Sequence, residues 1–270
     1  MNNIILQGVE GSYSHQFVIK NFNKYNLQFV DNFKKVAEGV ASNLYDYGIL
    51  PLENSTAGSV DDTYKLLNEY DLHICGLDAI KVNHCLLGVK GTSLEGIKAV
   101  SSHPQALMQC ENFLKSLNVK TENELNTAIA SFNLSKTKDI TKGVIASELC
   151  AKLYNLEILK ENCQDAELNS TRFVIISKNL TLDKLNYNRV SVLCRIQDKR
   201  NSLSKLLSLF SFHKINLTKI ESKNIANTNF EVNFYIDFEW NKSNEKLLKF
   251  IDKLKRKTKF FKFLGVYYSA

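Results

Sequence analysis

The chain has 270 residues, 44% of them hydrophobic, and a formal charge of +7 from 35 basic and 28 acidic residues. This length exceeds one average domain and the apolar content is enough to bury sizeable cores, so we expect two domains. The charges are spread along the sequence, which does not indicate a nucleic-acid partner. The N-terminus lacks a basic start and has only a short apolar run. We therefore expect no signal peptide, no membrane partner and a cytoplasmic protein.

The six cysteines are widely spaced and form no C-x-x-C pair. No neighbouring histidine pattern indicates a zinc site, so we expect reduced, mostly buried thiols and no metal. The strand–helix pairs also lack a Gly-x-Gly-x-x-Gly fingerprint and a phosphate loop. A nucleotide cofactor is therefore not predicted.

Short apolar runs alternate with amphipathic stretches through the first two thirds of the chain, which predicts an α/β architecture. The expected strands are Ile4–Gln7, Leu27–Val30, Tyr47–Leu50, Ile74–Leu77, Leu86–Val89, Lys98–Ser101, Gly143–Ala146 and Phe173–Ser177. The expected helices are Ser14–Phe22, Lys34–Asn43, Val60–Glu69, Gln105–Ser116, Thr127–Leu134 and Glu148–Tyr154.

From about Asn188 the pattern becomes strand, helix, strand, strand, helix, strand. Apolar residues alternate with polar ones from Val190 to Ile196 and from Phe230 to Phe238, as in half-buried strands. Leucines at helical spacing lie between and after these strands. The order βαββαβ predicts a ferredoxin-like domain, joined to the first by the polar segment Lys178–Asn188.

The chain has two prolines, and each marks a loop after an expected strand. After Pro51, Asn54 and Ser55 lie beside free backbone N–H groups that suit a carboxylate, although an ordinary capped turn has the same pattern. After Pro104, Gln105 could face a pocket at the end of a strand. His103 has the side-chain pKa of a general acid, but a lone histidine is more often a structural hydrogen-bonding group.

Two further loops are rich in polar groups. Gly8–His15 places glycines and serines between a strand and a helix, as in an anion-binding turn or a simple capped βα turn. Asn169–Phe173 leads polar residues directly into an apolar strand. The arginine in this segment, Arg172, needs an acidic partner, either in the protein or in a ligand.

Taken together, these four loops resemble the prephenate dehydratases, and they occur in that family's order. The family motifs are matched by Gly8-Val9-Glu10-Gly11-Ser12-Tyr13-Ser14-His15, Pro51-Leu52-Glu53-Asn54-Ser55-Thr56-Ala57-Gly58-Ser59-Val60, His103-Pro104-Gln105-Ala106-Leu107-x-Gln109-Cys110 and Thr171-Arg172-Phe173. Past the linker, residues 215–222 look like the family's regulatory ACT domain. The resemblance covers nearly the whole chain.

The resemblance implies a catalytic domain with two lobes like a type II periplasmic binding protein, followed by the ferredoxin-like ACT domain. Residues 1–178 would form the catalytic domain, with lobe one at 1–77 and 157–178 and lobe two at 78–156. The ACT domain would span 188–270. Because no helical stretch resembling chorismate mutase precedes the first motif, we expect a monofunctional enzyme.

The implied activity is a lyase reaction of phenylalanine biosynthesis, in which prephenate loses carbon dioxide and water to give phenylpyruvate. Aromatisation drives the reaction, so neither a metal nor an organic cofactor is required. Thr171 matches the family's catalytic threonine and would assist the departing hydroxide by hydrogen bonding or proton relay. The substrate-binding candidates are Tyr13, Ser14, Asn54, Ser55, Ser59, Gln105, Arg172 and Phe173. Of these, Arg172 should not grip the carboxylate that leaves, because a strong ion pair would stabilise the ground state; Phe173 could shield the ring or be plain core.

The resemblance also implies feedback by L-phenylalanine bound where ACT domains pair, in a homodimer or homotetramer. The effector candidates are Asn201, Ser202, Leu203, Asn216, Leu217, Glu221 and Ser222. The sequence departs from the family pattern here, because Asn201-Ser202-Leu203 replaces Gly-Ala-Leu and Lys223-Asn224 replaces Arg-Pro. Loss of the glycine puts a side chain where a ligand would approach the backbone closely.

Two alternatives stay open. An arogenate dehydratase would perform the same chemistry on the amino acid, and the motifs do not separate the two substrates. A non-catalytic amino-acid sensor would combine a binding-protein-like cleft with an ACT domain. The retained Thr171-Arg172-Phe173 triplet argues against the sensor.

Overall fold

The structure, a computed structural model, describes residues 1–180, 182, 186–225, 228 and 231–269. The chain forms two compact units, each built from three stretches of sequence. Unit one comprises Met1–Val36, Ile49–Thr63 and Ala79–Phe173, and unit two comprises Ala37–Gly48, Tyr64–Asp78 and Val174–Ala270. Some elements begin in one unit and end in the other, namely α2 (Phe33–Ala41), β3 (Tyr47–Asn54), α3 (Asp61–Glu69), β5 (His73–Lys81) and β11 (Ser170–Ser177).

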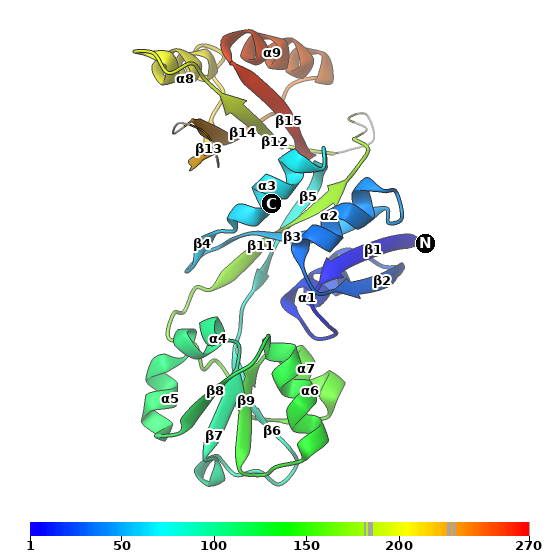
Figure 1. Cartoon of the computed structure of the whole chain (residues 1–270), viewed down its shortest axis with the longest axis vertical. Coiled ribbons are helices and arrows are strands. Elements are labelled where there is room, and N and C mark those ends of the chain that lie inside the picture. Colours follow the sequence, from blue (N-terminus) through cyan, green and yellow to red (C-terminus); the bar gives the residue numbers. More distant parts are fainter. Residues whose placement is uncertain (181, 183–185, 226–227, 229–230, 270) are drawn as a thin grey trace. The chain divides into compact units, whose positions relative to one another are not determined.

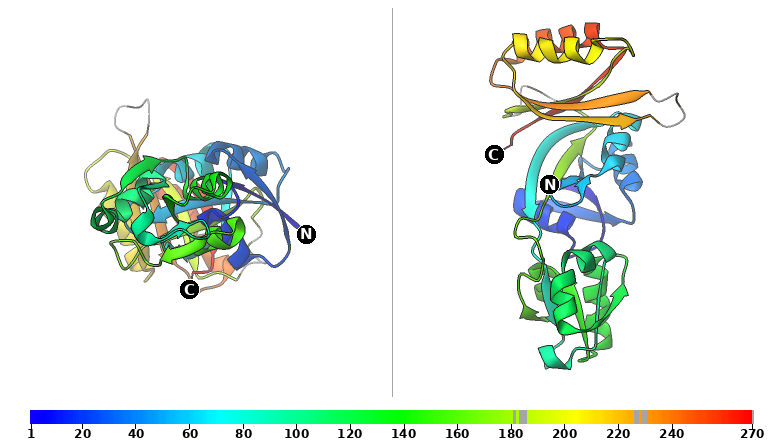
Figure 2. Two further views of the ribbon diagram at one scale, coloured as in Figure 1. Left: turned by 90° about the horizontal axis from the view of Figure 1, so that it is seen from below. Right: turned by 90° about the vertical axis from the view of Figure 1, so that its left-hand side faces the viewer.

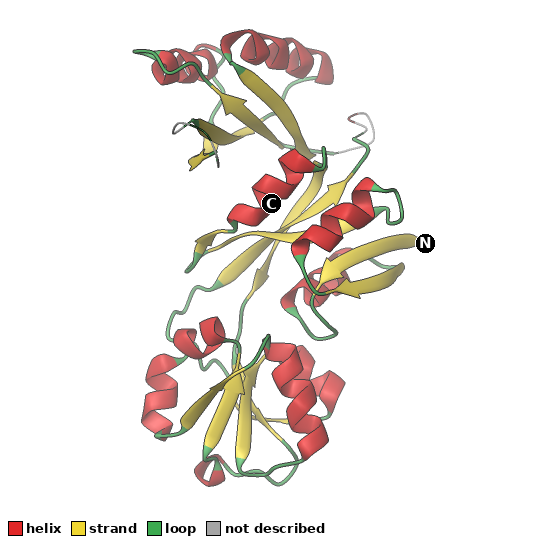
Figure 3. Cartoon of the chain, viewed as in Figure 1, coloured by secondary structure: helices red, strands yellow, loops and turns green. Residues whose placement is uncertain are grey.

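Unit one is a mixed α/β unit (Figures 1 and 3). Its own strands are β1 (Asn2–Gln7), β2 (Tyr25–Val30), β4 (Gly58–Ser59), β6 (Cys85–Gly88), β7 (Ala99–Ser102), β8 (Lys120–Asn123), β9 (Lys142–Ala146) and β10 (Glu157–Lys160). Its helices are α1 (Tyr13–Asn21), the 3₁₀ turn η1 (Leu94–Gly96), α4 (Pro104–Gln109), α5 (Glu111–Leu117), α6 (Thr127–Thr137) and α7 (Glu148–Tyr154).

Five of these strands form a sheet in the order β10-β6-β9-β7-β8, covered by helices on both faces (Figure 3). Because successive side chains of a strand point to opposite faces, each face has its own core. Leu87 and Val144 pack with α6 and α7, whereas Leu86 and Ile145 pack with α4 and α5. The central strands β6 and β9 are therefore apolar on both faces, as expected for strands buried between helices.

Unit two contains the predicted βαββαβ order. Its elements are β12 (Arg189–Arg195), α8 (Ser202–Phe212), β13 (Leu217–Asn224), β14 (Val232–Glu239), α9 (Asn244–Lys257) and β15 (Phe260–Tyr267). These four strands lie in the antiparallel order β13-β14-β12-β15, with both helices on one face (Figure 2, right). Val190, Val192, Ile236 and Phe238 pack there against the apolar sides of the helices. The predicted ferredoxin-like arrangement is confirmed.

Within unit two, β15 also pairs in parallel with β5 through Gly265 and Ile74. Gly265 has φ +147°, and a Cβ at this position would lie 2.0 Å from the Ile74 carbonyl oxygen. Lys262, nearby on β15, donates to the Leu67 carbonyl at the end of α3 (2.8 Å) and pairs with Asp71 (2.9 Å). At position 265 only glycine fits, because the backbones of β15 and β5 approach each other too closely for a Cβ atom.

The structure differs from the sequence prediction in a few elements. Strands β8 and β10 were not predicted, and the helix expected at Gln105–Ser116 is two helices that meet at Cys110. Part of the expected linker Lys178–Asn188, and Phe230 of the expected strand, lie outside the described residues. The six cysteines are free. None of the helices in the described part of the chain has the length and hydropathy that a bilayer-spanning segment needs.

Candidate active site

Unit one contains a pocket of about 460 Å³, here named the threonine pocket, which opens at the ends of β3 and β11. It is lined by Gln7, Ser12, Tyr13, Ser14, Phe33, Pro51, Asn54, Ala57, Gly58, Ser59, Val60, Val82, His84, His103, Gln105, Ala106, Gln109, Leu125, Asn126, Thr127, Thr171 and Phe173. All four motif loops contribute. The structure thus brings together Thr171 and six of the eight substrate-binding candidates, leaving Ser55 and Arg172 outside the lining.

The described lining of this pocket consists of hydroxyl, amide, imidazole and apolar groups, without a carboxylate, lysine or arginine. Burial lowers the pKa of His84, although the hydrogen bond with Gln109 opposes the shift. Burial likewise lowers the pKa of His103. Both imidazoles are therefore neutral near pH 7, and the pocket is polar but uncharged. Among the described residues, no group of three or more His, Cys, Asp or Glu could hold a metal ion.

The Thr171 hydroxyl is oriented by Asn54. The Asn54 side-chain oxygen accepts from the backbone N–H groups of Thr56 (3.0 Å) and Ala57 (2.9 Å), so its nitrogen must point the other way. That nitrogen donates to Thr171 Oγ1 at 2.9 Å. Since the threonine oxygen accepts this bond, its own proton stays free to be donated into the pocket.

The loop after β3 is tied to the start of β11 by paired hydrogen bonds. The Ser55 N–H donates to the Ser170 carbonyl (2.9 Å), and the Ser170 N–H donates to Ser55 Oγ (3.0 Å). Ser55 therefore uses its polar groups to fix the loop beside Thr171.

Arg172 finds its acidic partner inside the protein. Its guanidinium donates to Glu53 at 2.6 Å, with 56% of the arginine side chain exposed. This pair answers the question that the sequence left open, because side chains alternate along β11 and Arg172 points away from the face that Thr171 and Phe173 share.

Phe173 is 3% exposed and packs against Phe17, with ring centroids 5.4 Å apart, yet it also lines the pocket. The two roles considered for it, core and ring shield, are thus compatible. Tyr13 also lines the pocket, and its hydroxyl donates to the Asn83 carbonyl at 3.0 Å. Burial raises the pKa of Tyr13 well above its ordinary value, so the phenol stays protonated.

The two helix starts that carry motif residues are capped by side chains. Ser12 accepts from the His15 N–H (3.3 Å) at the start of α1, and His103 Nδ1 accepts from the Gln105 N–H (3.2 Å) at the start of α4. His103 therefore has a structural hydrogen bond in addition to its place in the lining. The caps hold Ser14 and Gln105 in fixed positions at the pocket.

His84, Gln109 and Asn169 are linked by hydrogen bonds beside the pocket, and none of the three was among the sequence candidates. His84 is 2% exposed and hydrogen-bonds Gln109, and Gln109 in turn accepts from the buried Asn169. Gln109 and Asn169 lie in the motif segments given above, whereas His84 lies in none of them and directly precedes β6. Its only signal in the sequence is a polar side chain just before a buried strand.

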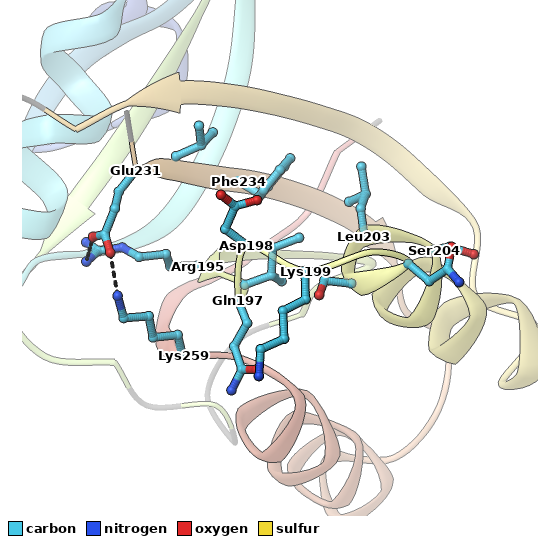
Figure 4. Close-up of a pocket in the computed structure, with 13 residues that line it drawn as sticks. Arg195, Gln197, Asp198, Lys199, Leu203, Ser204, Glu231, Phe234 and Lys259 are labelled. Carbon is cyan, nitrogen blue, oxygen red and sulfur yellow. Dashed lines mark hydrogen bonds and ion pairs between the residues drawn. The ribbon is translucent and has the colours of Figure 1, made fainter. Parts of the chain in front are cut away.

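Unit two contains a second pocket, of about 640 Å³, here named the charged pocket (Figure 4). It is lined by Arg195, Ile196, Gln197, Asp198, Lys199, Asn201, Ser202, Leu203, Ser204, Glu231, Val232, Phe234 and Lys259. Glu231 pairs with Arg195 (2.9 Å) and with Lys259. Asn201 has φ +63°, the left-handed conformation that glycine and asparagine tolerate best.

Three of the seven effector candidates, Asn201, Ser202 and Leu203, line the charged pocket. The other four lie in or just before β13, where the Asn216 carbonyl accepts from the Glu239 N–H (2.9 Å). Glu221 pairs there with Lys219 (3.2 Å) and Lys223 (2.6 Å). Among the described residues, the charged pocket thus holds three of the seven effector candidates.

Fold and pocket together define an α/β domain whose pocket presents neutral hydroxyl and amide groups, and the chain continues into a ferredoxin-like domain. Residues 4–181, more than half of the chain, match the family model described as prephenate dehydratase. The chain belongs to the prephenate dehydratase family, as the sequence motifs predicted.

Named relatives agree with this assignment. The chain is 37% identical to the prephenate dehydratase of Methanocaldococcus jannaschii over 268 residues, which cover 96% of this chain and 95% of the relative. It is 35% identical over 279 residues to arogenate dehydratase/prephenate dehydratase 1 of Arabidopsis thaliana, covering 98% of this chain and 71% of the relative.

Solved structures share the fold over nearly the whole chain. Prephenate dehydratase of Arthrobacter aurescens in complex with L-Phe has a TM-score of 0.87 and 21% identity, covering 99% of this chain and 90% of that one. The structure of GqqA, described as a novel type of quorum quenching acylase, has a TM-score of 0.89 and 29% identity, covering 99% and 98%. The predicted fold class is confirmed.

Proposed function

We propose that the threonine pocket converts prephenate to phenylpyruvate, and that Thr171 is its catalytic residue. The observation that carries the proposal is the bond from Asn54 Nδ2 to Thr171 Oγ1 (2.9 Å), which leaves the threonine proton free to be donated. A fixed hydroxyl donor suits a reaction whose main difficulty is the departure of hydroxide.

In the proposed reaction, the bond from the ring to its carboxylate breaks and carbon dioxide leaves. The electron pair moves into the ring while the bond to the ring hydroxyl breaks on the opposite carbon. The electron pair from the broken carbon–carbon bond stays in the ring, which becomes aromatic, and hydroxide departs with the electron pair of the carbon–oxygen bond. Thr171 donates a hydrogen bond to the departing oxygen, where negative charge develops, so its stabilisation is larger in the transition state than in the ground state.

The carboxylate of the pyruvyl arm needs hydrogen-bond donors. Ser14, Ser59 and Gln105 line the pocket and are the donors that we assign to it. Asn54, Ser55 and Arg172 fill supporting roles in this proposal, because their polar groups hold Thr171, the loop and Glu53. Pairing of Arg172 with Glu53 keeps a strong cation away from the carboxylate that must leave.

Arogenate is the alternative substrate, and the name of the Arabidopsis relative includes both activities. Arogenate carries an ammonium group on its side arm, whereas prephenate carries a neutral carbonyl. The amide and hydroxyl donors of the described lining suit the carbonyl oxygen, so we favour prephenate.

Assaying the purified protein on both substrates decides this: phenylpyruvate formation with a higher kcat/KM for prephenate is expected. A preference for arogenate would reassign the substrate, and turnover of neither would refute the function.

An acylase reaction, the activity for which GqqA is named, fits the site less well. Acyl transfer through Thr171 needs a base in contact with its hydroxyl. Within the described part of the chain, the side chain hydrogen-bonded to Thr171 Oγ1 is the amide of Asn54, which is not a base. A purely sensing role is also disfavoured, because the family motifs of the pocket are retained.

The remaining parts of the proposal concern regulation and assembly. We assign residues 1–178 to the catalytic domain and 188–270 to an ACT domain that binds L-phenylalanine in a cytoplasmic homodimer or homotetramer. The complex of the Arthrobacter enzyme with L-Phe supports the effector, and the single activity in the name of the M. jannaschii relative supports a monofunctional enzyme. Adding L-phenylalanine to the assay should lower the rate; an unchanged rate would mean that the altered effector motifs no longer sense it.

A further inference from the structure

The hydrogen bond to Thr171 belongs to a network of side-chain hydrogen bonds. In each bond of this network the donor and the acceptor can be assigned in turn. The network starts from backbone N–H groups of Thr56 and Ala57, which can only donate, and which fix the oxygen of Asn54. The Asn54 nitrogen therefore donates both to Thr171 Oγ1 (2.9 Å) and to Asn169 Oδ1 (3.0 Å). Because the Asn169 oxygen accepts from Asn54, the orientation of the Asn169 amide is fixed as well, with its nitrogen on the other side.

Asn169 is 1% exposed, and its nitrogen donates to Gln109 Oε1 at 3.0 Å. The Gln109 nitrogen donates at 2.9 Å to Thr56 Oγ1, which itself donates to Asn54 Oδ1 at 2.6 Å. The three amides and the Thr56 hydroxyl thus form a closed loop in which each donor meets an acceptor. Reversing any one amide would place like groups against each other.

His84 lies next to this loop, with Nε2 2.9 Å from Gln109 Oε1. Since that oxygen can only accept, Nε2 carries a proton, and in the neutral ring Nδ1 carries none. The Tyr13 hydroxyl lies 3.3 Å from Nδ1 and 3.0 Å from the Asn83 carbonyl oxygen, so its single proton is shared between these two acceptors. The backbone of His84 is held on both sides, by Gln164 Oε1 (2.9 Å) and by the Cys163 N–H (2.8 Å). Because the residue is only 2% exposed, the histidine is a fixed donor.

We propose that His84 is a positioning residue for the dehydratase reaction, which as its Nε2–H tautomer holds Gln109, and through Asn169 and Asn54 keeps the Thr171 hydroxyl aimed into the pocket. The inference rests on the proposed function of Thr171. It assigns His84 no contact with the reacting atoms. The donor on His84 acts at a distance by holding the Gln109 amide in place, and so the loop of amides that ends at Asn54.

A kinetic double-mutant cycle tests this role. His84→Leu should lower kcat about 10-fold with KM little changed, because one orienting hydrogen bond is lost and carboxylate binding is not. In a Thr171→Ala background the same substitution should have no further effect on kcat, since there is no hydroxyl left to orient. His84→Gln, which keeps a donor for Gln109, should recover most of the activity. His213→Leu, at the end of α8 in unit two, is the matched control and should leave kcat unchanged.

An equal loss of kcat from His84→Leu with and without Thr171 would overturn the proposal, as would full activity of His84→Leu in an active parent. Inactivity of the parent on prephenate would instead refute the proposed function. The tautomer can be measured without turnover, from the ring nitrogen chemical shifts of His84 in ¹⁵N-labelled protein, with His84→Gln identifying the signal. Protonation at Nε2 is expected near pH 7, and an Nδ1–H tautomer would disprove the inferred polarity.

Discussion

The two pockets of this molecule differ in how their polar groups are held. In the threonine pocket, neutral amides, hydroxyls and a histidine hydrogen-bond one another, and Asn169 and His84 are almost fully buried. In the charged pocket, ion pairs join Arg195, Glu231 and Lys259, whose side chains are 23%, 33% and 54% exposed. Buried neutral networks are costly to rearrange, whereas exposed ion pairs contribute little and exchange readily with water and salt.

The difference suggests that the two pockets have different roles. A buried network of this kind suits the role proposed for the threonine pocket, which is to keep one hydroxyl in place during the reaction. The charged pocket can rearrange its ion pairs around a ligand at low cost. This agrees with the sequence, where the family motifs are retained around Thr171 and altered at Asn201-Ser202-Leu203.

The largest expected effect is at the rigid pocket. Thr171→Ala should lower kcat by about 10²–10³, because it removes the single preorganised donor to the leaving oxygen. Thr171→Ser, which keeps the hydroxyl, should retain far more activity. Steady-state kinetics with prephenate measure both. Full activity of the alanine variant would show that Thr171 is not catalytic. The proposed functional difference between the two pockets would then lose its basis.

A second substitution tests how much the close backbone contact of Gly265 contributes to the stability of unit two, for comparison with the ion pairs of the charged pocket. Gly265→Ala should destabilise the protein by about 2–4 kcal/mol, combining backbone strain with a clash against Ile74. Gly91→Ala is the matched control, since its φ is also positive (+88°) but its Cβ would meet no atom within 4 Å. Urea unfolding compares the two, and equal losses would show that the approach to Ile74 is not what requires glycine.

The buried histidines give a smaller, pH-dependent effect. Burial lowers the pKa of His15, His84 and His103 in unit one and of His73 in unit two. The unfolded chain therefore takes up protons first as the pH falls below about 6.5, and the free energy of unfolding should decrease between pH 7 and 5. His84→Gln should make this decrease shallower. A stability that stays constant or rises on acidification would contradict the neutral state that we assign to His84.

The smallest effect is expected in the charged pocket. Glu231→Gln removes the partner of two partly exposed cations and should change the free energy of unfolding by less than about 1 kcal/mol. Asn169→Leu, by comparison, leaves buried partners unsatisfied and should cost about 1–3 kcal/mol. Denaturant titrations at low and high salt check both. A larger loss for Glu231→Gln would show that the charged pocket is also rigid.

Sequence patterns predicted the buried elements well and the polar ends of elements poorly. Strand β8 was missed because all four of its residues are polar and exposed. Strand β3 runs on to Asn54 and β11 begins at Ser170, beyond the apolar stretches that were recognised. Polar residues of the site thus extend the strands, and periodicity cannot reveal this. The helix break at Cys110 was also hidden, because Leu107, Cys110 and Leu114 share one apolar face.

The candidate site shows the same limit. The motifs indicated the loops that meet at the threonine pocket, and the roles assigned to their residues stay predictions. Alternation along β11 could have indicated that Arg172 faces away from Thr171 and Phe173, but its partner Glu53 depends on which strands are neighbours. The place of His84 depends on hydrogen bonds between residues far apart in sequence, and these leave no spacing pattern.

The pairing of Gly265 with Ile74 has a consequence for how the chain is made. The strand that contains Gly265, β15, is the last element before the C-terminus, whereas its partner β5 lies in the first third of the sequence. During synthesis, this edge of β5 therefore stays unpaired until all the elements between β5 and β15 have been made, and such long-range pairing is slow to form. Until then the nascent chain exposes a strand edge that other strands can pair with wrongly.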